Sequence, residues 1–271
     1  MLKQRIITAL ILAPIAIACV FLLPPPGFSV FVGLVLAVAA WEWANLADFE
    51  GAVRYVYSIV IVLLMAVSLF VPPLVILTAG LAWWCLAFFL VVRYPKSREL
   101  WGTQMIRALL GAFMLIPAFT GMRELKMMPD SSFLILLLFL LIWGADIGAY
   151  FAGRAFGRAK LAPEVSPGKS WAGLYGGLVS ALVIAAIMLL VAGDISIVSR
   201  RGVVFLLGCA FVVMVSVLGD LAESMFKRNR GIKDSSQLLP GHGGFLDRID
   251  SLLSAGPAFC LFIMLFGWNH P

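Results

Sequence analysis

The fold class is decided by residues 202–219, GVVFLLGCAFVVMVSVLG, which contain 18 amino acids and no charged side chain. A helix of roughly 20 apolar residues, at about 1.5 Å rise per residue, crosses the hydrocarbon core of a bilayer. The whole chain of 271 residues is 62% hydrophobic, with a mean hydropathy of +1.04. Because this composition is too apolar for a water-soluble domain, the sequence predicts an all-α, polytopic integral membrane protein.

Charges and prolines divide the rest of the chain into similar apolar segments. We expect about nine membrane-spanning helices, near residues 6–23, 28–46, 55–71, 74–92, 107–122, 132–152, 173–193, 202–222 and 251–268. No internal repeat or long linker separates folded units. The N-terminal helices (1–130) and the C-terminal region (131–271), which holds the candidate site, are therefore expected to form one continuous membrane domain.

Positive charges are distributed unevenly between the two sides of such a bundle. With the N-terminus in the cytoplasm, sixteen of the 20 Lys and Arg side chains lie on the cytoplasmic side, and four lie on the opposite side. This split obeys the positive-inside rule, so we expect the N-terminus and the C-terminal polar segments to be cytoplasmic. Since the cations are spread over several short loops, no nucleic-acid partner is expected.

The apolar stretch is followed by the most polar run of the chain, residues 224–250, SMFKRNRGIKDSSQLLPGHGGFLDRID. It holds five of the 20 basic residues, three of the 14 acidic residues and one of the two histidines. A charge at the bilayer centre costs at least about 2.5–3.5 kcal/mol, so this run is expected in water or along a polar cavity. Its cations, acids, glycines and histidine suit phosphate and metal chemistry.

Helical spacing gathers further polar residues at the same level of the membrane. Two sets should each share one helix face: Asp146, Tyr150 and Gly153, and Asp220, Glu223, Ser224 and Lys227. Asp247, Asp250, Ser251 and Ser254 repeat the second spacing. Between them, residues 161–171 are predicted to form a loop. There Ser166 or Ser170 caps the next helix, and Lys169 contributes to an anion site.

Asp220 and Asp247 are the best candidates for metal ligands, because carboxylates at helix ends suit Mg²⁺. The alternative is a salt bridge from each to a neighbouring cation, and the spacing alone leaves both open. The nearby cations could neutralise a polyphosphate or bind anionic lipid head groups: Lys227, Arg228, Lys233 and Arg248. His242 stands among three glycines, and we expect it to contact a ligand.

Glu42 is the one acidic residue well inside an apolar segment of the first half. A buried acid in a membrane protein is a functional candidate by default. Beside Trp41 and Trp43 near a helix end, it is interpreted as a structural or interfacial residue.

Taken alone, the residues predict a cytoplasm-facing, Mg²⁺-dependent site that handles phosphates. The alternative is a membrane transporter or binding protein for an anionic, phosphate-bearing solute.

The polar run matches a specific pattern: Ser224-x-x-Lys227-Arg228-x₄-Lys233-Asp234-x₅-Pro240-Gly241-His242-Gly243-Gly244-x-x-Asp247-Arg248-x-Asp250. It closely resembles the motif of the phosphatidate cytidylyltransferases, also called CDP-diacylglycerol synthases. The segments 146–154, 166–171 and 219–224 look like that family too. The resemblance covers the second half, and the first half only through its hydrophobic pattern. One departure is Ala172, where many relatives carry an acidic or amide side chain, so Ala172 is given no polar role.

The resemblance implies that CTP and phosphatidic acid from the membrane react, with Mg²⁺, to give CDP-diacylglycerol and pyrophosphate. It also implies a bacterial-type inner (cytoplasmic) membrane, and it leaves a homodimer open. On the residues that match, Asp220 and Asp247 would bind the metal, with Asp146 and Asp250 as orienting or additional ligands. Phosphates and substrate would be held by the remaining polar residues of the motifs: Ser166, Lys169, Ser224, Lys227, Arg228, Lys233, His242 and Arg248.

Overall fold

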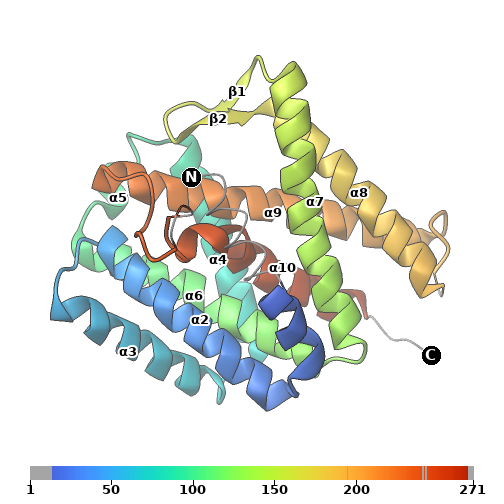
Figure 1. Cartoon of the computed structure of the whole chain (residues 1–271), viewed down its shortest axis with the longest axis horizontal. Helices are drawn as coiled ribbons and strands as arrows, with labels where there is room; N and C mark the ends of the chain where they lie inside the picture. The colour runs from blue at the N-terminus through green and yellow to red at the C-terminus, as the bar shows by residue number, and fades with distance from the viewer. Residues whose placement is uncertain (1–13, 194, 240, 242, 268–271) are drawn as a thin grey trace.

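The computed structural model describes residues 14–193, 195–239, 241 and 243–267 and is mostly helical (Figure 1). Its helices are α2 Pro25–Leu46, α3 Ala52–Ser68, α4 Pro73–Val92, α5 Arg98–Trp101, α6 Gln104–Met127, α7 Ser131–Phe156, α8 Trp171–Ala192, α9 Arg200–Arg230 and α10 Asp250–Phe266. Two short strands, β1 Lys160–Ala162 and β2 Ser166–Ser170, and a 3₁₀ turn, η1 Leu246–Arg248, complete the elements. A mostly helical membrane protein is thereby confirmed.

Six helices in the described part of the chain are long and apolar enough to cross a membrane: α2, α4, α6, α7, α8 and α9. Helices α3 and α10 are also apolar but have 17 residues each, and they coincide with the expected segments 55–71 and 251–268. The expected segment 6–23 falls largely outside the described residues. The prediction of nine spans is therefore not confirmed.

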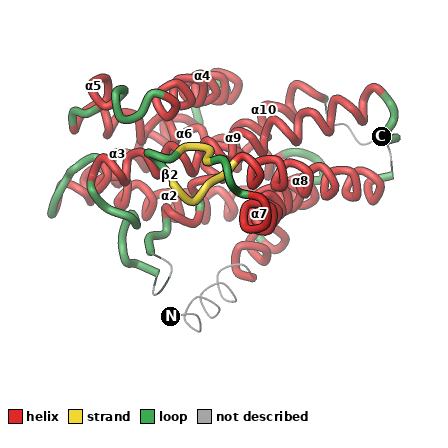
Figure 2. The backbone as a smooth tube through the Cα atoms, turned by 90° about the horizontal axis from the view of Figure 1, so that it is seen from above, coloured by secondary structure: helices red, strands yellow, loops and turns green. Residues whose placement is uncertain are grey.

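Two groups of helices flank the centre of the molecule. Helices α7 and α8 form an antiparallel pair on one side of the molecule (Figures 1 and 2). Helices α2, α3 and α6 lie on the opposite side. Helices α9 and α10 contact one another. Small residues permit the close packing of α7 on α8: a Cβ on Gly148 would lie 2.1 Å from Ser180 Oγ, and one on Gly176 would lie 2.2 Å from Ala152 Cβ. Such contacts are common between membrane helices, because they bring two backbones together.

Helix α9 is the element that carries the site. Ser199 caps its start by accepting a hydrogen bond from the Gly202 N–H at 3.0 Å, and Gly231, at φ +74°, ends it. With 31 residues it is roughly 46 Å long, whereas the hydrocarbon core is about 30 Å thick. Its last polar turns therefore have the length to extend beyond an apolar span.

Aromatic packing fixes those last turns against the N-terminal half. The Phe226 ring lies with its centroid 4.9 Å from Trp43 and 4.8 Å from Trp101, both edge-on. The Trp43 Nε1–H donates to the Arg107 carbonyl at 2.8 Å, and all three rings are fully buried. Edge-on aromatic pairs add stability beyond their buried area. The polar end of α9 is thus held in one place relative to α2.

Residues 161–171 differ from the loop that the sequence predicts. Strands β1 and β2 pair antiparallel, with Lys160 opposite Ser170 and Ala162 opposite Ser166. The hairpin stands at the end of the α7–α8 pair (Figure 1). Ser170 caps α8 by accepting from the Gly173 N–H at 3.1 Å, whereas Ser166 begins β2 and caps nothing. The turn between the strands comprises residues 163–165 and includes Pro163, whereas Pro167 and Gly168 lie within β2.

Candidate active site

The predicted polar face of α9 is present. The Ser224 hydroxyl lies 3.2 Å from Asp220 Oδ1, one turn apart, and Lys227 Nζ lies 3.2 Å from Glu223 Oε2. Lys227 and Glu223 are buried in the protein. Four ionisable or hydroxyl side chains therefore point to one side of the helix, as residues three and four apart must.

Lys227 makes two buried ion pairs, with Glu223 and with Asp247, and the pair with Asp247 is the shorter. Lys227 Nζ lies 2.6 Å from Asp247 Oδ1. The other carboxylate oxygen, Oδ2, accepts from the Ser235 N–H at 3.0 Å, the Ser235 hydroxyl at 3.1 Å and the Gly244 N–H at 2.8 Å. Burial acts to raise the pKa of Asp247, but the Lys227 charge and the donated hydrogen bonds outweigh it and hold that pKa below its usual value.

The hairpin supplies a second ion pair. Lys169 Nζ, on β2, lies 2.7 Å from Asp220 Oδ2. Asp146, on α7, is within electrostatic range of Lys169, Asp220 and Arg248. The three polar segments that the sequence places at one membrane level therefore do meet. They come from α7, the hairpin and α9.

Helix α10 brings one more carboxylate to this group. Asp250, its first residue, interacts electrostatically with Asp220 and Glu223. The close approach depends on Gly219, because a Cβ there would lie 2.6 Å from the Asp250 carbonyl oxygen and 2.3 Å from Ser254 Oγ. Glu223 is fully buried, and it faces both the Lys227 ammonium, 3.2 Å from its Oε2, and the Asp250 side chain. Because several carboxylates share the charge of Lys227, the site has capacity for a further cation.

The remaining predicted residues lie around this centre in different ways. Arg228 donates to the carbonyls of Val165 and Ile232, at 3.2 and 3.3 Å, and so ties α9 to the hairpin. Lys233 is exposed, and no ion pair joins it to another residue in the described ranges. Arg248 is exposed in η1, and Ser166 is half-buried in β2. His242 lies outside the described residues.

A residue of the first half also belongs to the site. Glu42, on α2, accepts hydrogen bonds from the Ser235 and Ser236 hydroxyls and from the backbone N–H groups of Phe245 and Leu246. From its sequence context alone, Glu42 is interpreted as a structural or interfacial residue. The signal available in the sequence is that it is a lone acid inside an apolar segment, which does not reveal its partners.

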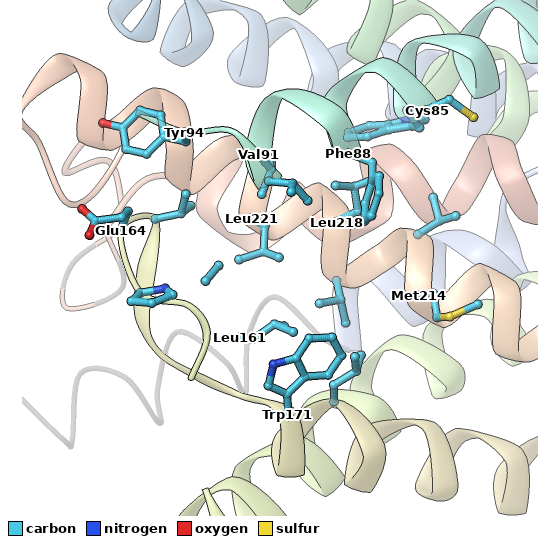
Figure 3. A pocket seen from close by; sticks show the side chains of 18 of the residues that line it. Cys85, Phe88, Val91, Tyr94, Leu161, Glu164, Trp171, Met214, Leu218 and Leu221 are labelled. Atoms are coloured by element: carbon cyan, nitrogen blue, oxygen red, sulfur yellow. The ribbon is translucent and has the colours of Figure 1, made fainter. Parts of the chain in front are cut away.

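An apolar cavity of about 770 Å³ adjoins the ionic centre. Figure 3 shows Phe88 and Val91 of α4 across from Leu161 and Trp171, with Leu221 of α9 beside them. Leu221 follows Asp220, and Trp171 follows Ser170, so the same short segments carry polar groups to the site and apolar groups to the cavity. Phe88 and Cys85 are exposed, which opens the cavity on the outer surface of α4.

Among the described residues, no group of three or more His, Cys, Asp or Glu side chains is placed to hold a metal ion by itself. Mg²⁺ does not require such a group, because it usually takes one or two carboxylates and completes its shell with water and phosphate. The carboxylates here outnumber the cations that pair with them, because Lys169 and Lys227 face Asp220, Glu223 and Asp247. In its chemistry, the donor set fits a magnesium ion that a substrate phosphate also binds.

Comparison with known proteins covers both halves of the chain. The sequence model of the Cytidylyltransferase family matches residues 3–266. The phosphatidate cytidylyltransferase of Pseudomonas aeruginosa is 50% identical over 274 residues, which cover 100% of both chains. That of Haemophilus influenzae is 41% identical over 283 residues, which cover 97% of this chain and 98% of the relative. These matches extend over the first half as well as the polar run, and the chain belongs to the cytidylyltransferase family.

Proposed function

We propose that this protein transfers the cytidylyl group of CTP to phosphatidate, which gives CDP-diacylglycerol for phospholipid synthesis and releases pyrophosphate. The observation that carries this function is the full-length likeness, at 50% identity, to a phosphatidate cytidylyltransferase. The ionic centre beside an apolar cavity supports it, because the two substrates are a water-soluble polyphosphate and a lipid with a phosphate head group. The alternative, a transporter, does not explain the family likeness or this motif, and it is not favoured.

The chemistry needs little proton transfer from the protein. The phosphate monoester of phosphatidate has a second pKa near 6, so its oxygen is already a nucleophile at neutral pH. That oxygen bonds to the α-phosphorus of CTP, and the bond to the β-phosphate oxygen breaks, so that pyrophosphate leaves with the electron pair. The barrier lies in bringing two anions together and in stabilising the leaving charge, which positioned cations accomplish.

The cations of the site divide into two groups for this work. Lys233 and Arg248 are exposed and lie on the segment that follows α9, where they can bind a triphosphate that arrives from water. Lys169 lies on the hairpin whose residues also line the apolar cavity, so we assign it, with Ser166, to the lipid phosphate. Arg228 holds the hairpin in place, and Ser224 and His242 are assigned to substrate contacts.

Magnesium is the proposed cofactor, with Asp220 and Asp247 as its ligands and Asp146 and Asp250 as orienting or additional ligands. When bound, the ion would neutralise phosphate charge and favour departure of pyrophosphate. Asp220 is the more accessible of the two ligands, since its side chain is 32% exposed and that of Asp247 is 5% exposed. Lys227, between Glu223 and Asp247, would keep both carboxylates oriented.

The apolar cavity is proposed to hold an acyl chain of phosphatidate. Its walls come from α4, α8, α9 and the hairpin, and the hairpin also presents Lys169 to the site. A lipid whose phosphate lies at Lys169 would therefore place its chains against Leu161, Trp171 and Leu221. The protein is a multi-pass membrane protein. We propose that it lies in the inner membrane with this site facing the cytoplasm, where CTP is found.

The deciding experiment is turnover of the purified full-length chain in detergent with phosphatidate, Mg²⁺ and each nucleoside triphosphate in turn. Release of pyrophosphate with CTP, matched by formation of CDP-diacylglycerol, is the expected result, and removal of Mg²⁺ by chelation should abolish it. Binding of the substrates without pyrophosphate release would contradict the proposal and favour a transporter or binding protein.

A further inference from the structure

Glu42, on α2, contacts the polar loop, residues 231–249, from inside the protein. Its side chain is completely buried, at 0% exposure. Oε1 accepts from the Ser236 hydroxyl and from the Phe245 N–H at 2.9 Å. Oε2 accepts from the Leu246 N–H and from the Ser235 hydroxyl at 3.2 Å. One carboxylate therefore faces four hydrogen-bond donors of the loop, of which the Ser235 hydroxyl shares its single proton with Asp247 Oδ2.

The four donors lie at two places that are distant along the loop. Residues 235–236 form one place and residues 245–246 form the other, and the carboxylate joins them across the eight residues between. A backbone hydrogen bond from the Leu239 N–H to the Gly243 carbonyl, at 2.9 Å, closes the same turn further out. Glu42 thus closes the base of the loop, whereas the backbone of the loop itself closes the turn near its tip.

Steric evidence shows how tightly this base is packed. A Cβ on Gly244 would lie 1.9 Å from Ser235 Oγ and 2.9 Å from Glu42 Oε1. A second hydrogen bond joins α2 to the loop, because the Asn45 Nδ2 group donates to the Ser235 carbonyl at 3.0 Å. The end of α2 and the loop therefore fit together without space for even one additional carbon atom at this point.

Ser235 connects Glu42 to the reacting centre. Its hydroxyl lies 3.2 Å from Glu42 Oε2 and 3.1 Å from Asp247 Oδ2, and its backbone N–H donates to Asp247 at 3.0 Å. Asp247 in turn lies 2.6 Å from Lys227 Nζ. A displacement of the loop base would therefore move the carboxylate of Asp247 away from Lys227, which would keep only Glu223 of its two carboxylate partners.

A buried carboxylate is costly unless its oxygens are hydrogen-bonded, and hydrogen bonds to a charged acceptor are roughly twice as strong as neutral ones. The oxygens of Glu42 are hydrogen-bonded in this way only when the loop is in place. We propose that Glu42 is a positioning residue. It fixes the polar loop so that Asp247 and Lys227 are set for CTP, and the N-terminal half thereby takes a direct part in the site. This role rests on the proposed function.

The test is the Glu42→Gln variant of the full-length protein, which keeps the shape and replaces one charged acceptor oxygen with an amide NH₂ that faces donors. We expect kcat/KM for CTP to fall about tenfold to a hundredfold, with an increased KM, since hydrogen bonds to a charged group are lost. Hydrogen–deuterium exchange of peptides that cover 237–246 should be faster, while peptides from α6 and α10 should be unchanged. Glu42→Asp, which keeps the charge, should protect the loop better than Glu42→Gln.

The matched control is Glu50→Gln, because Glu50 lies just beyond α2 with its side chain 85% exposed, and this variant should behave as wild type.

The inference is overturned if Glu42→Gln keeps kcat and KM within about twofold of wild type. It is equally overturned if exchange increases over the whole protein while KM is unchanged, because that pattern indicates general destabilisation. If Glu42→Gln does not fold, the Ser235→Ala/Ser236→Ala double variant removes two of the donors and gives the same readouts. Wild-type protein that releases no pyrophosphate would refute the proposed function, and the exchange comparison would still decide the role of Glu42.

Discussion

Two ion pairs of the site, Lys169–Asp220 and Lys227–Asp247, differ in exposure, and the difference distinguishes a structural contact from an accessible one. Lys169 and Asp220 join the hairpin to α9 with side chains that are 25% and 32% exposed. Lys227 and Asp247 join α9 to the polar loop with side chains that are 9% and 5% exposed. A partly exposed pair can exchange partners with an arriving anion or cation at little cost, because its desolvation is incomplete. A buried pair that loses one partner leaves a costly unpaired charge.

The largest expected effect comes from breaking the buried pair. Asp247→Asn removes the nearer of the two carboxylates that pair with Lys227, leaves Glu223 at 3.2 Å, and weakens the acceptor for Ser235 and Gly244. We expect loss of most pyrophosphate release, together with destabilisation of roughly 3 kcal/mol, as for one partner removed from a buried pair. Activity assays and thermal unfolding in detergent measure the two effects. Glu99→Gln, an exposed acid outside the site, is the control. Wild-type stability in Asp247→Asn would show that the pair is not a scaffold.

The exposed pair should separate activity from stability. Asp220→Asn leaves Lys169 facing solvent, and exposed ion pairs contribute only about 0–1 kcal/mol. We therefore expect thermal stability close to wild type, with a loss of turnover as severe as in Asp247→Asn because a metal ligand is removed. A variant with normal turnover would remove Asp220 from the metal assignment. One with greatly reduced stability would show that the hairpin contact, too, is part of the scaffold.

The double variant sharpens the comparison. If Asp220 and Asp247 serve one magnesium site, Asp220→Asn/Asp247→Asn should turn over scarcely more slowly than either single variant, because the site acts as a unit. The double variant should lose about as much stability as Asp247→Asn alone, because Asp220→Asn is expected to have little effect on stability. Mild activity losses that add would indicate two independent ion pairs. Steady-state pyrophosphate release from the two singles and the double distinguishes these outcomes.

The sequence predicted the parts of this site that lie within one helix. The apolar run 202–219 and the spacing of Asp220, Glu223, Ser224 and Lys227 specify α9 and its polar face, because both patterns repeat with the helical period. The hairpin was not predicted, because strands of three and five residues give no period to detect. Asp247 is in a 3₁₀ turn before α10, so the helical spacing proposed for it with Asp250 is not what brings it to Lys227.

The role of Glu42 could not be found from local pattern at all. Its loop partner Ser235 lies 193 positions away in the chain. Periodicity reports which residues share a helix face, and it contains no information on which distant loop covers that face. The motif resemblance had the same limit, since it rested on the second half. The family match over residues 3–266 extends the likeness to α2, but only the fold places Glu42 against the loop.

The smallest expected effect tests the apolar side of the site. Cys85 is exposed and lines the cavity, whereas Cys19 does not line it. If an acyl chain of phosphatidate enters this cavity, lipid at severalfold its Kd should slow alkylation of Cys85 by about threefold or more, as mass action requires for a site that is mostly occupied. Glycerol 3-phosphate, which has the head group without the chains, should give no protection, and Cys19 should react at one rate throughout. Equal alkylation of Cys85 with and without phosphatidate would place the chains elsewhere on the helices. Protection by glycerol 3-phosphate would show that closure of the hairpin over Lys169, and not an acyl chain, is what shields the cavity.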